Sequence, residues 1–244
     1  MSSWSEAIGS RFYRLAKAAS RMTNKNMIKA VIFDMDGVIV DSEPLQSLSW
    51  KKLFNERGIK PIYNNEGLIH EVGPTGDQSY LSIMEKHNLK KEELETIRKR
   101  RREIFEKIIR EKLKPMAGFL DLIEALKKQK LKLAIASNRI GVHVNLMMET
   151  IGVKNYFEII VCRNDNIKAK PSPDIFLETA KKLKVKPFEC LVLEDSETGV
   201  TAAKKAKMKV IAIPNKYTKN NNFSKADKIV DNLSQISLEL INSF

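Results

Sequence analysis

The chain has 244 residues, of which 43% are hydrophobic and 30% are charged, and these proportions are typical of a folded globular protein. They exclude collagen-like, coiled-coil and wholly disordered chains, and the length excludes a multidomain array. The net charge of +13 permits attraction to nucleic acid, anionic membranes or phosphorylated metabolites without choosing among them. No stretch approaches the roughly 18 uninterrupted apolar residues of a membrane helix, so we expect a soluble protein.

Residues 1–26 are expected to form an N-terminal extension outside the fold, because the first predicted strand begins just after Met27. The segment has one acidic residue, Glu6, and its basic residues are Arg11, Arg14, Lys17, Arg21 and Lys25. We favour an extension without a targeting role; a mitochondrial or plastid transit peptide and a basic surface anchor remain as alternatives. A secretory signal is excluded because the segment has no apolar stretch of about 7 residues.

The two cysteines, Cys162 and Cys190, each lie within an apolar run typical of a strand. They offer neither a disulfide framework nor a CxxC metal site, which favours a reducing compartment. We therefore expect a cytoplasmic location, with organelle targeting by residues 1–26 left open.

Apolar, β-rich runs alternate with amphipathic segments along the rest of the chain. Helices are expected to begin at Pro44, after Gly118 and at Ser172-Pro173, where Ser172 would be the N-cap and Pro173 the first helical residue. Near-continuous apolar strands between helices predict a parallel sheet that is covered on both faces. The predicted strands are residues 28–33, 131–136, 158–161, 190–193 and 209–213.

An insertion separates the first two predicted strands, because the segment between them is much longer than an ordinary crossover helix. Residues 44–114 read as a small helical domain with one loop at 72–76, and residues 27–43 and 115–244 as the core domain. The basic run from Arg98 to Arg102 shares a helical period with apolar residues and is flanked by glutamates. We interpret this run as a solvated helix face rather than a nucleic-acid patch.

Asp34 and Asp36 follow the first apolar strand, at the edge where open α/β sheets bind ligands. A turn at Asp36-Gly37 can redirect the second carboxylate, which would leave one group to attack and the other to transfer protons. The alternative is an Asp-Gly turn that only ends the strand. It is disfavoured because Asp34 lies inside the apolar run and would be costly to bury without a partner or a metal.

A second acidic pair, Glu194 and Asp195, ends the strand that begins at Cys190. Two acidic strand ends brought together would hold a hard cation such as Mg²⁺, which prefers oxygen ligands and shares them with phosphate. An alternative role for Asp195 or Ser196 is the N-cap of the helix that follows.

Two further polar groups follow predicted strands. Ser137, with the backbone N–H groups that follow it at Asn138, could bind phosphate at a helix N-terminus, although Ser-Asn is also a common helix cap. Lys168 or Lys170, in a segment stiffened by prolines, could point towards the carboxylates, although most lysines are exposed. A parallel sheet would gather these groups along one edge.

Taken together, these four segments resemble the ordered motifs of the haloacid dehalogenase-like hydrolase superfamily. The position of the insertion is similar to the cap of subclass I, and residues 41–44 and 170–176 are similar to the β-phosphoglucomutase-like and sugar-phosphate phosphatase branch. The resemblance implies an α/β fold with a Rossmann-like parallel sheet, helices on both faces and an inserted helical cap domain. It also implies a phosphoaspartyl mechanism.

The resemblance assigns roles to individual residues of this sequence. Asp34 would be the nucleophile, and Asp36 would protonate the leaving alcohol and then activate water. Ser137, Asn138 and Lys170 would bind the phosphoryl group of a small phosphorylated metabolite. The Mg²⁺ cofactor would be held by Asp34, the backbone carbonyl of Asp36 and Asp195, with Glu194 either a direct ligand or acting through the other ligands.

The cap departs from the mutase pattern. Mutases of this branch have a histidine shortly after the first linker and basic residues around a cap-loop glycine, whereas this chain has Gln46 in the first position and Val72 and Gly76 around Gly73. A phosphatase is therefore our main prediction and a phosphosugar mutase the alternative. His70 could contact substrate, although we favour a partly exposed structural histidine.

A protein that keeps the fold only to bind nucleic acid or a surface is a third interpretation. It is disfavoured because no catalytic carboxylate is missing. We accordingly expect no nucleic-acid partner, no membrane and a monomer.

Overall fold

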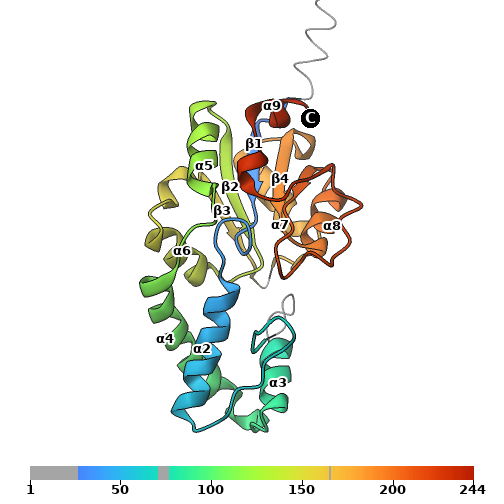
Figure 1. Cartoon of the computed structure of the whole chain (residues 1–244). Coiled ribbons are helices and arrows are strands. Elements are labelled where there is room, and N and C mark those ends of the chain that lie inside the picture. Colours follow the sequence, from blue (N-terminus) through green and yellow to red (C-terminus); the bar gives the residue numbers. More distant parts are fainter. Residues whose placement is uncertain (1–26, 71–76, 165) are drawn as a thin grey trace, which may run out of the picture.

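The structure is a computed structural model that describes residues 27–70, 77–164 and 166–244 (Figure 1). The extension at residues 1–26 and the whole of the predicted cap loop at 72–76 lie outside the described residues. None of the described helices is long and apolar enough to cross a membrane.

A parallel sheet forms the centre of the core, as the apolar runs predict. The strand order is β3-β2-β1-β4-β5-β6, and every pair is parallel. The sixth strand was not predicted, because it has two exposed residues and no apolar run. The strands are β1 (Ala30–Phe33), β2 (Lys132–Ser137), β3 (Ile159–Cys162), β4 (Cys190–Glu194), β5 (Lys209–Ala212) and β6 (Lys228–Ile229).

Side chains alternate between two hydrophobic clusters along the central strand, which explains why it is apolar throughout. Val31 and Phe33 belong to one cluster, and Ala30 and Ile32 to the other. Helices α5 (Phe119–Lys128), α6 (Gly141–Thr150) and α9 (Leu238–Asn242) contribute to the first cluster. Helices α7 (Asp174–Leu183) and α8 (Glu197–Lys205) contribute to the second. The predicted covering of both faces is therefore confirmed.

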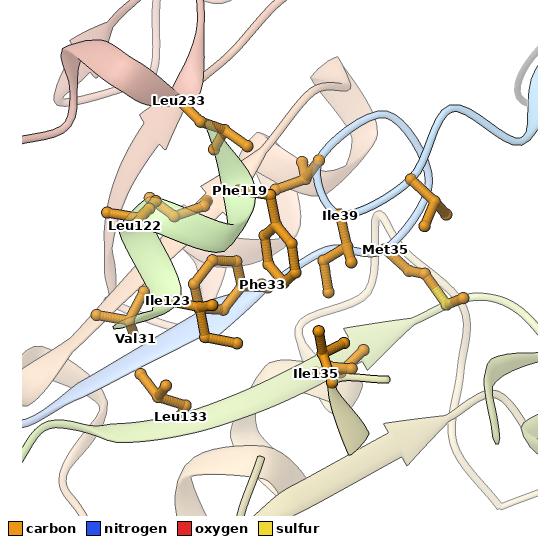
Figure 2. Packing of buried hydrophobic residues seen from close by; sticks show 14 of the residues in the cluster. Val31, Phe33, Met35, Ile39, Phe119, Leu122, Ile123, Leu133, Ile135 and Leu233 are labelled. Atoms are coloured by element: carbon orange, nitrogen blue, oxygen red, sulfur yellow. The ribbon is translucent and has the colours of Figure 1, made fainter. Parts of the chain in front are cut away.

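Aromatic packing fixes α5 against the central strand (Figure 2). The rings of Phe33 and Phe119 meet edge to face, with centroids 5.8 Å apart, and both side chains are fully buried. Phe119 is the first residue of α5, directly after Gly118. The contact therefore fixes where the chain re-enters the core after the insertion.

The start of α7 differs by one residue from the prediction. The carbonyl of Pro173 accepts from the backbone N–H groups of Phe176 and Leu177 at 3.0 Å, so Pro173 is the N-cap and Asp174 the first helical residue. The assignment of Ser172 as N-cap is therefore wrong. The backbone of Pro173 already has helical φ and ψ angles. Its carbonyl accepts the first hydrogen bonds of the helix, so Pro173 is the residue that precedes the first helical one.

The helices between β1 and α5 form a separate body beside one end of the sheet (Figure 1). They are α2 (Glu43–Glu56), α3 (Asp77–Lys86) and α4 (Leu94–Lys112), and they enclose their own cluster around Trp50 and Phe54. Phe105 and Ile109 on α4 belong instead to the first core cluster. Helix α4 therefore packs on both bodies. Short 3₁₀ segments occur at Lys91–Glu93, Lys154–Tyr156, Pro187–Glu189 and Leu233–Gln235.

Candidate active site

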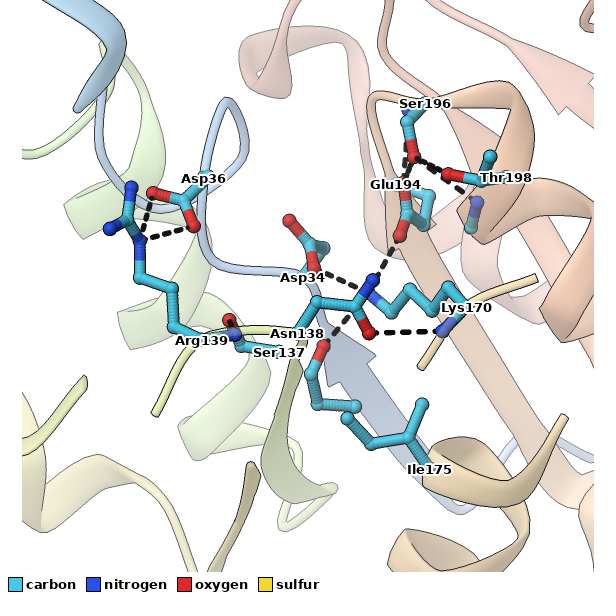
Figure 3. Close-up of polar contacts among 12 residues, drawn as sticks. Asp34, Asp36, Ser137, Asn138, Arg139, Lys170, Ile175, Glu194, Ser196 and Thr198 are labelled. Carbon is cyan, nitrogen blue, oxygen red and sulfur yellow. Dashed lines mark hydrogen bonds and ion pairs between the residues drawn. The ribbon is translucent and has the colours of Figure 1, made fainter. Parts of the chain in front are cut away.

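The polar groups singled out in the sequence come together at the carboxyl ends of three neighbouring strands (Figure 3). Asp34 follows β1, Ser137 ends β2 and Glu194 ends β4. The sheet order reverses direction at β1 and β4, which is the position where open α/β sheets bind ligands. This topology explains how segments far apart in the chain reach one site.

Lys170 lies at the centre of the site. Its ammonium group donates to Asp34 Oδ1, to Glu194 Oε1 at 2.7 Å and to the carbonyl of Ala136 at 2.9 Å. Its backbone N–H donates to Asn138 Oδ1 at 3.0 Å, so the residue after Ser137 positions the segment that carries the lysine. Of the two lysines left open by the sequence, the structure brings Lys170 into the site and leaves Lys168 exposed.

Burial dominates the electrostatics of the carboxylates. Burial raises the pKa of Asp34 to about 7, even though the nearby Lys170 lowers it. Burial, with the negative charges of Glu194 and Asp34, also raises the pKa of Asp195 well above its ordinary value. Burial lowers the pKa of Lys170, but Asp34 and Glu194 outweigh it, so the net shift is upward and the lysine stays charged. One buried cation therefore faces an excess of buried carboxylates.

Asp36 points away from Asp34, as a turn at this position predicts (Figure 3). Arg139 Nε donates to both carboxylate oxygens of Asp36, at 2.8 and 2.6 Å, and Ser42 Oγ donates to Asp36 Oδ1. Arg139 Nη2 also donates to Ser42 Oγ at 2.9 Å. The two carboxylates thus have different partners and face different parts of the site, which is consistent with two separate chemical roles.

Gly37 allows the turn that redirects Asp36. Its φ of +83° is in the left-handed region, and an added Cβ would lie 2.1 Å from Asp195 Oδ2 and 2.6 Å from Asn215 Nδ2. Asn215 Nδ2 donates to Asp195 Oδ2 at 2.7 Å, so these two side chains occupy the space that a larger residue would need. A glycine at residue 37 therefore leaves the space that Asp195 and Asn215 occupy in the site.

Replacing Gly37 with Ala should lower the free energy of unfolding by about 1–3 kcal/mol, because it adds both backbone strain and a clash with Asp195. Urea denaturation measures this change. Gly58→Ala is the matched control, since Gly58 has a φ of +67° but nothing within 4 Å of an added Cβ. Equal losses in the two variants would contradict a role for close packing at residue 37.

Glu194 and Asp195 have distinct surroundings. Glu194 Oε2 accepts from the backbone N–H and the hydroxyl of Ser196, both at 2.9 Å, while Oε1 accepts from Lys170. Ser196 Oγ accepts from the backbone N–H of Gly199 at 3.1 Å and is the N-cap of α8. The sequence left open whether Asp195 or Ser196 is the N-cap of this helix. The structure shows that it is Ser196, so the carboxylate of Asp195 does not cap the helix.

The donor set fits a hard divalent cation. Asp34 and Asp195 are 8% exposed, all the available donors are oxygen atoms, and burial disfavours the charged form of both carboxylates. A cation would compensate that cost. In the described ranges no three Asp, Glu, His or Cys side chains are grouped as metal ligands.

A cavity of about 380 Å³ extends from these carboxylates to the inserted helices. The prediction of a solvated helix face is confirmed for the exposed residues Lys99, Arg100 and Arg102 but is wrong for Arg101, and the prediction for His70 is also wrong. Arg101 is 8% exposed and lines the cavity rather than a solvated helix face, because α4 turns that side towards Trp50 and the core. His70 is 5% exposed rather than partly exposed, because it packs into the inserted body and its Nε2 hydrogen-bonds with Glu43 Oε2.

Sequence reasoning missed Arg139 and Asn215. Arg139 directly follows Ser137-Asn138, and a basic residue so close to a strand end was a signal that could have drawn attention to it. Asn215 offered no such signal, because it lies in a polar loop after β5 and reaches Asp195 only through the fold.

Known proteins are similar to this chain along most of its length. The family model described as haloacid dehalogenase-like hydrolase matches residues 31–213. A putative phosphatase of Bacillus subtilis (YhcW) is 34% identical over 216 residues, which cover 88% of this chain and 96% of that protein. A phosphorylated carbohydrates phosphatase of Thermotoga maritima is 32% identical, covering 73% and 82%. The β-phosphoglucomutase of Bacillus subtilis is 30% identical, covering 88% and 94%.

Among solved structures, CbbY from Rhodobacter sphaeroides in complex with phosphate superimposes with a TM-score of 0.77. It is 25% identical, and the alignment covers 88% of this chain and 100% of that one. The α/β fold with its parallel sheet is therefore shared along most of the chain.

Proposed function

Since the chain belongs to the haloacid dehalogenase-like hydrolase family, we propose that it is a phosphatase that hydrolyses small phosphate monoesters, of sugars or polyols, through an aspartyl-phosphate intermediate. The observation that carries this proposal is the contact between Lys170 and Asp34. Asp34 and the buried ammonium group of Lys170 line the same cavity, and this pair supports the proposal because phosphoryl transfer needs both a nucleophile and a positive charge.

In the first step, an oxygen of Asp34 attacks phosphorus. The Asp34–phosphorus bond forms as the bond between phosphorus and the ester oxygen breaks, and Asp36 gives a proton to the departing alcohol. Lys170 and Ser137 hold the phosphoryl oxygens, and Asn138 keeps Lys170 in position through the backbone hydrogen bond. The charge that develops on the phosphoryl oxygens is thereby stabilised.

In the second step, Asp36 takes a proton from water, which attacks the same phosphorus. The bond to Asp34 then breaks, and inorganic phosphate leaves with the carboxylate restored. Asp36 is suited to proton transfer because it lies at the cavity and away from the nucleophile. Its contacts with Arg139 and Ser42 hold it on that side.

Asp34, the backbone carbonyl of Asp36 and Asp195 would hold Mg²⁺, which supplies positive charge next to the phosphoryl group when it is bound. Both oxygens of Glu194 already accept hydrogen bonds, so we assign Glu194 to positioning Lys170 and Ser196. Asn215 would orient Asp195 in the same site.

Chelation provides a direct test of the metal. We expect phosphate release to disappear after dialysis against EDTA and to return on addition of Mg²⁺, because the buried carboxylates otherwise repel the substrate phosphate. Colorimetric measurement of inorganic phosphate follows both changes. Full activity in the chelated, dialysed protein would contradict a metal-dependent hydrolase.

The alternative is a phosphosugar mutase. One relative of this chain is named a β-phosphoglucomutase. A mutase returns the phosphoryl group to a sugar and excludes water, whereas a phosphatase releases inorganic phosphate without a bisphosphate activator. We favour the phosphatase because Gln46 is in the position where mutases of this branch have a histidine.

The experiment is a panel of sugar, polyol and nucleoside monophosphates, assayed for inorganic phosphate with and without Mg²⁺. Metal-dependent release would support the phosphatase and rank its substrates. Isomerised sugar phosphate without inorganic phosphate would support the mutase.

A further inference from the structure

The turn after β5 supplies the hydrogen bond that the carboxylate of Asp195 receives within the described part of the chain. Asn215 Nδ2 donates to Asp195 Oδ2 at 2.7 Å. Asp195 is 8% exposed and lines the same cavity as Asp34 and Lys170, whereas Asn215 does not line it. Asn215 can therefore affect a ligand in the cavity only through Asp195.

The side-chain amide of Asn215 is held in one orientation. Its Oδ1 accepts from the backbone N–H of Tyr217 at 2.9 Å, so the oxygen faces the turn and the Nδ2 group faces Asp195. The backbone N–H of Asn215 donates to Thr218 Oγ1 at 3.0 Å, and its carbonyl accepts from the backbone N–H of Thr218 at 3.1 Å. Thr218 is 4% exposed, so the turn is anchored in the protein interior. The amide donor thus stays directed at Asp195.

Gly37 encloses the same oxygen of Asp195 from another side. A Cβ added at Gly37 would lie 2.1 Å from Asp195 Oδ2 and 2.6 Å from Asn215 Nδ2. The backbone of Gly37 therefore packs directly against Oδ2 and leaves no space there for a ligand. Oδ1 accepts no hydrogen bond from residues 27–70, 77–164 or 166–244. The two oxygens of Asp195 are therefore unequal, because Oδ2 is enclosed and Oδ1 is free.

The neighbouring carboxylates also have oxygens that are occupied by donors. Asp34 Oδ1 accepts from Lys170, and the two oxygens of Glu194 accept from Lys170 and Ser196. Those donors are a cation or lie within the cavity lining. The donor to Asp195 is different, because it is an uncharged amide from outside the cavity. Its removal would change the freedom of Asp195 without changing the charge of the site.

The number of oxygens that a carboxylate offers distinguishes two hard cations. Mg²⁺ demands near-ideal octahedral geometry with ligands at about 2.0–2.1 Å. Ca²⁺ takes about 6–8 oxygen ligands in a flexible geometry and accepts both oxygens of one carboxylate. A carboxylate that is fixed to offer one oxygen therefore suits Mg²⁺, and a carboxylate that can turn and offer both suits Ca²⁺.

We infer that Asn215 selects Mg²⁺ over Ca²⁺, because it holds Asp195 so that only Oδ1 is available to the cation. This inference rests on the proposed function, since it concerns the cation of that site, and it adds a selectivity that the proposed ligands alone do not specify. Asn215 is a positioning residue, because it acts on the cation only through a residue that holds it.

The test measures cation binding in the absence of substrate. Protein dialysed against EDTA and then against chelator-free buffer is titrated with Mg²⁺ and, separately, with Ca²⁺ in a calorimeter. The ratio of the two dissociation constants is compared between variants. Asn215→Ala removes the amide donor without changing the charge. Asn220→Ala is the matched control, because Asn220 is an exposed asparagine in the polar segment that follows the same turn.

The wild-type protein should bind Mg²⁺ more tightly than Ca²⁺. Asn215→Ala should shift the ratio towards Ca²⁺ by about tenfold or more, since loss of an outer hydrogen bond to a metal ligand weakens binding by about 10–100-fold and Ca²⁺ regains affinity from the second oxygen. Asn220→Ala should keep the wild-type ratio. A wild-type protein without a preference for Mg²⁺, or an Asn215→Ala variant that binds both cations more weakly by the same factor, would overturn the inference.

A second variant keeps the test decisive if Asn215→Ala does not fold. Asn215→Asp retains the shape of the side chain, removes the donor and adds a carboxylate oxygen, so the ratio should move in the same direction. The rise in unfolding temperature at equal concentrations of Mg²⁺ and Ca²⁺ gives an independent readout of the preference.

The result also separates this inference from the proposed function. If no ester were hydrolysed but the cation preference depended on Asn215, the proposed function would fail while the inference stood. If esters were hydrolysed and both Asn215 variants kept the wild-type ratio, the phosphatase would stand and the role of Asn215 in cation selection would be refuted.

Discussion

Asp34→Asn is expected to reduce phosphate release by at least about a thousandfold while the protein stays folded. The amide nearly preserves the shape of the carboxylate and can still accept the hydrogen bond from Lys170, but it is a poor nucleophile. Substitution also removes a carboxylate whose charged form is disfavoured by burial, which offsets part of the lost attraction to Lys170. Phosphate assays and thermal unfolding monitored by circular dichroism measure the two effects.

The aspartyl phosphate itself provides a second readout. Acid-quenched wild-type protein should retain label from a ³²P-labelled ester, and Asp34→Asn should not. Asp121→Asn is a suitable control, because Asp121 is an exposed residue of α5 away from the site. Substantial turnover or labelling in Asp34→Asn would show that another group is the nucleophile.

The sheet and the position of its site could be predicted because both depend on local patterns. Strands buried on two faces must be apolar throughout, and in a parallel sheet their carboxyl ends share one edge. Asp34, Ser137 and Glu194 each end or follow such a strand, so their convergence follows from the topology. The short strand β6 has no comparable pattern, because both of its residues are exposed.

The contacts at the far end of the cavity could not be predicted, because they depend on how α4 packs. Arg98, Arg100 and Arg101 belong to one basic run. The helical period of the sequence does not determine which of these arginines faces the core. Phe105 and Ile109 pack into the first core cluster, and this rotation of α4 turns Arg101 inward. The partner of Asp36 could not be predicted either, because Arg139 is 103 positions away in the sequence.

Lys170→Met is expected to lower both activity and stability. Activity should fall by about a hundredfold or more, because the phosphoryl group loses a fixed positive charge. The free energy of unfolding should fall by about 3–5 kcal/mol, because Asp34 and Glu194 would remain buried without the cation that now joins them. Phosphate assays and urea denaturation measure the two losses, and Lys168→Met, at an exposed lysine two positions away, is the control.

The loss of stability in Lys170→Met should also depend on pH. Lys170 now lowers the pKa of Asp34, so its removal should raise that pKa further above about 7. The folded variant would then bind more protons than the unfolded chain, and the variant should gain stability as pH falls from about 8 towards 5. Because wild-type Asp34 also takes up its proton near pH 7, the difference from wild type should shrink as pH falls towards about 7 and level off below it. A stability difference that does not change above pH 7 would mean that Lys170 stabilises the fold by packing rather than by compensating the buried charges of Asp34 and Glu194.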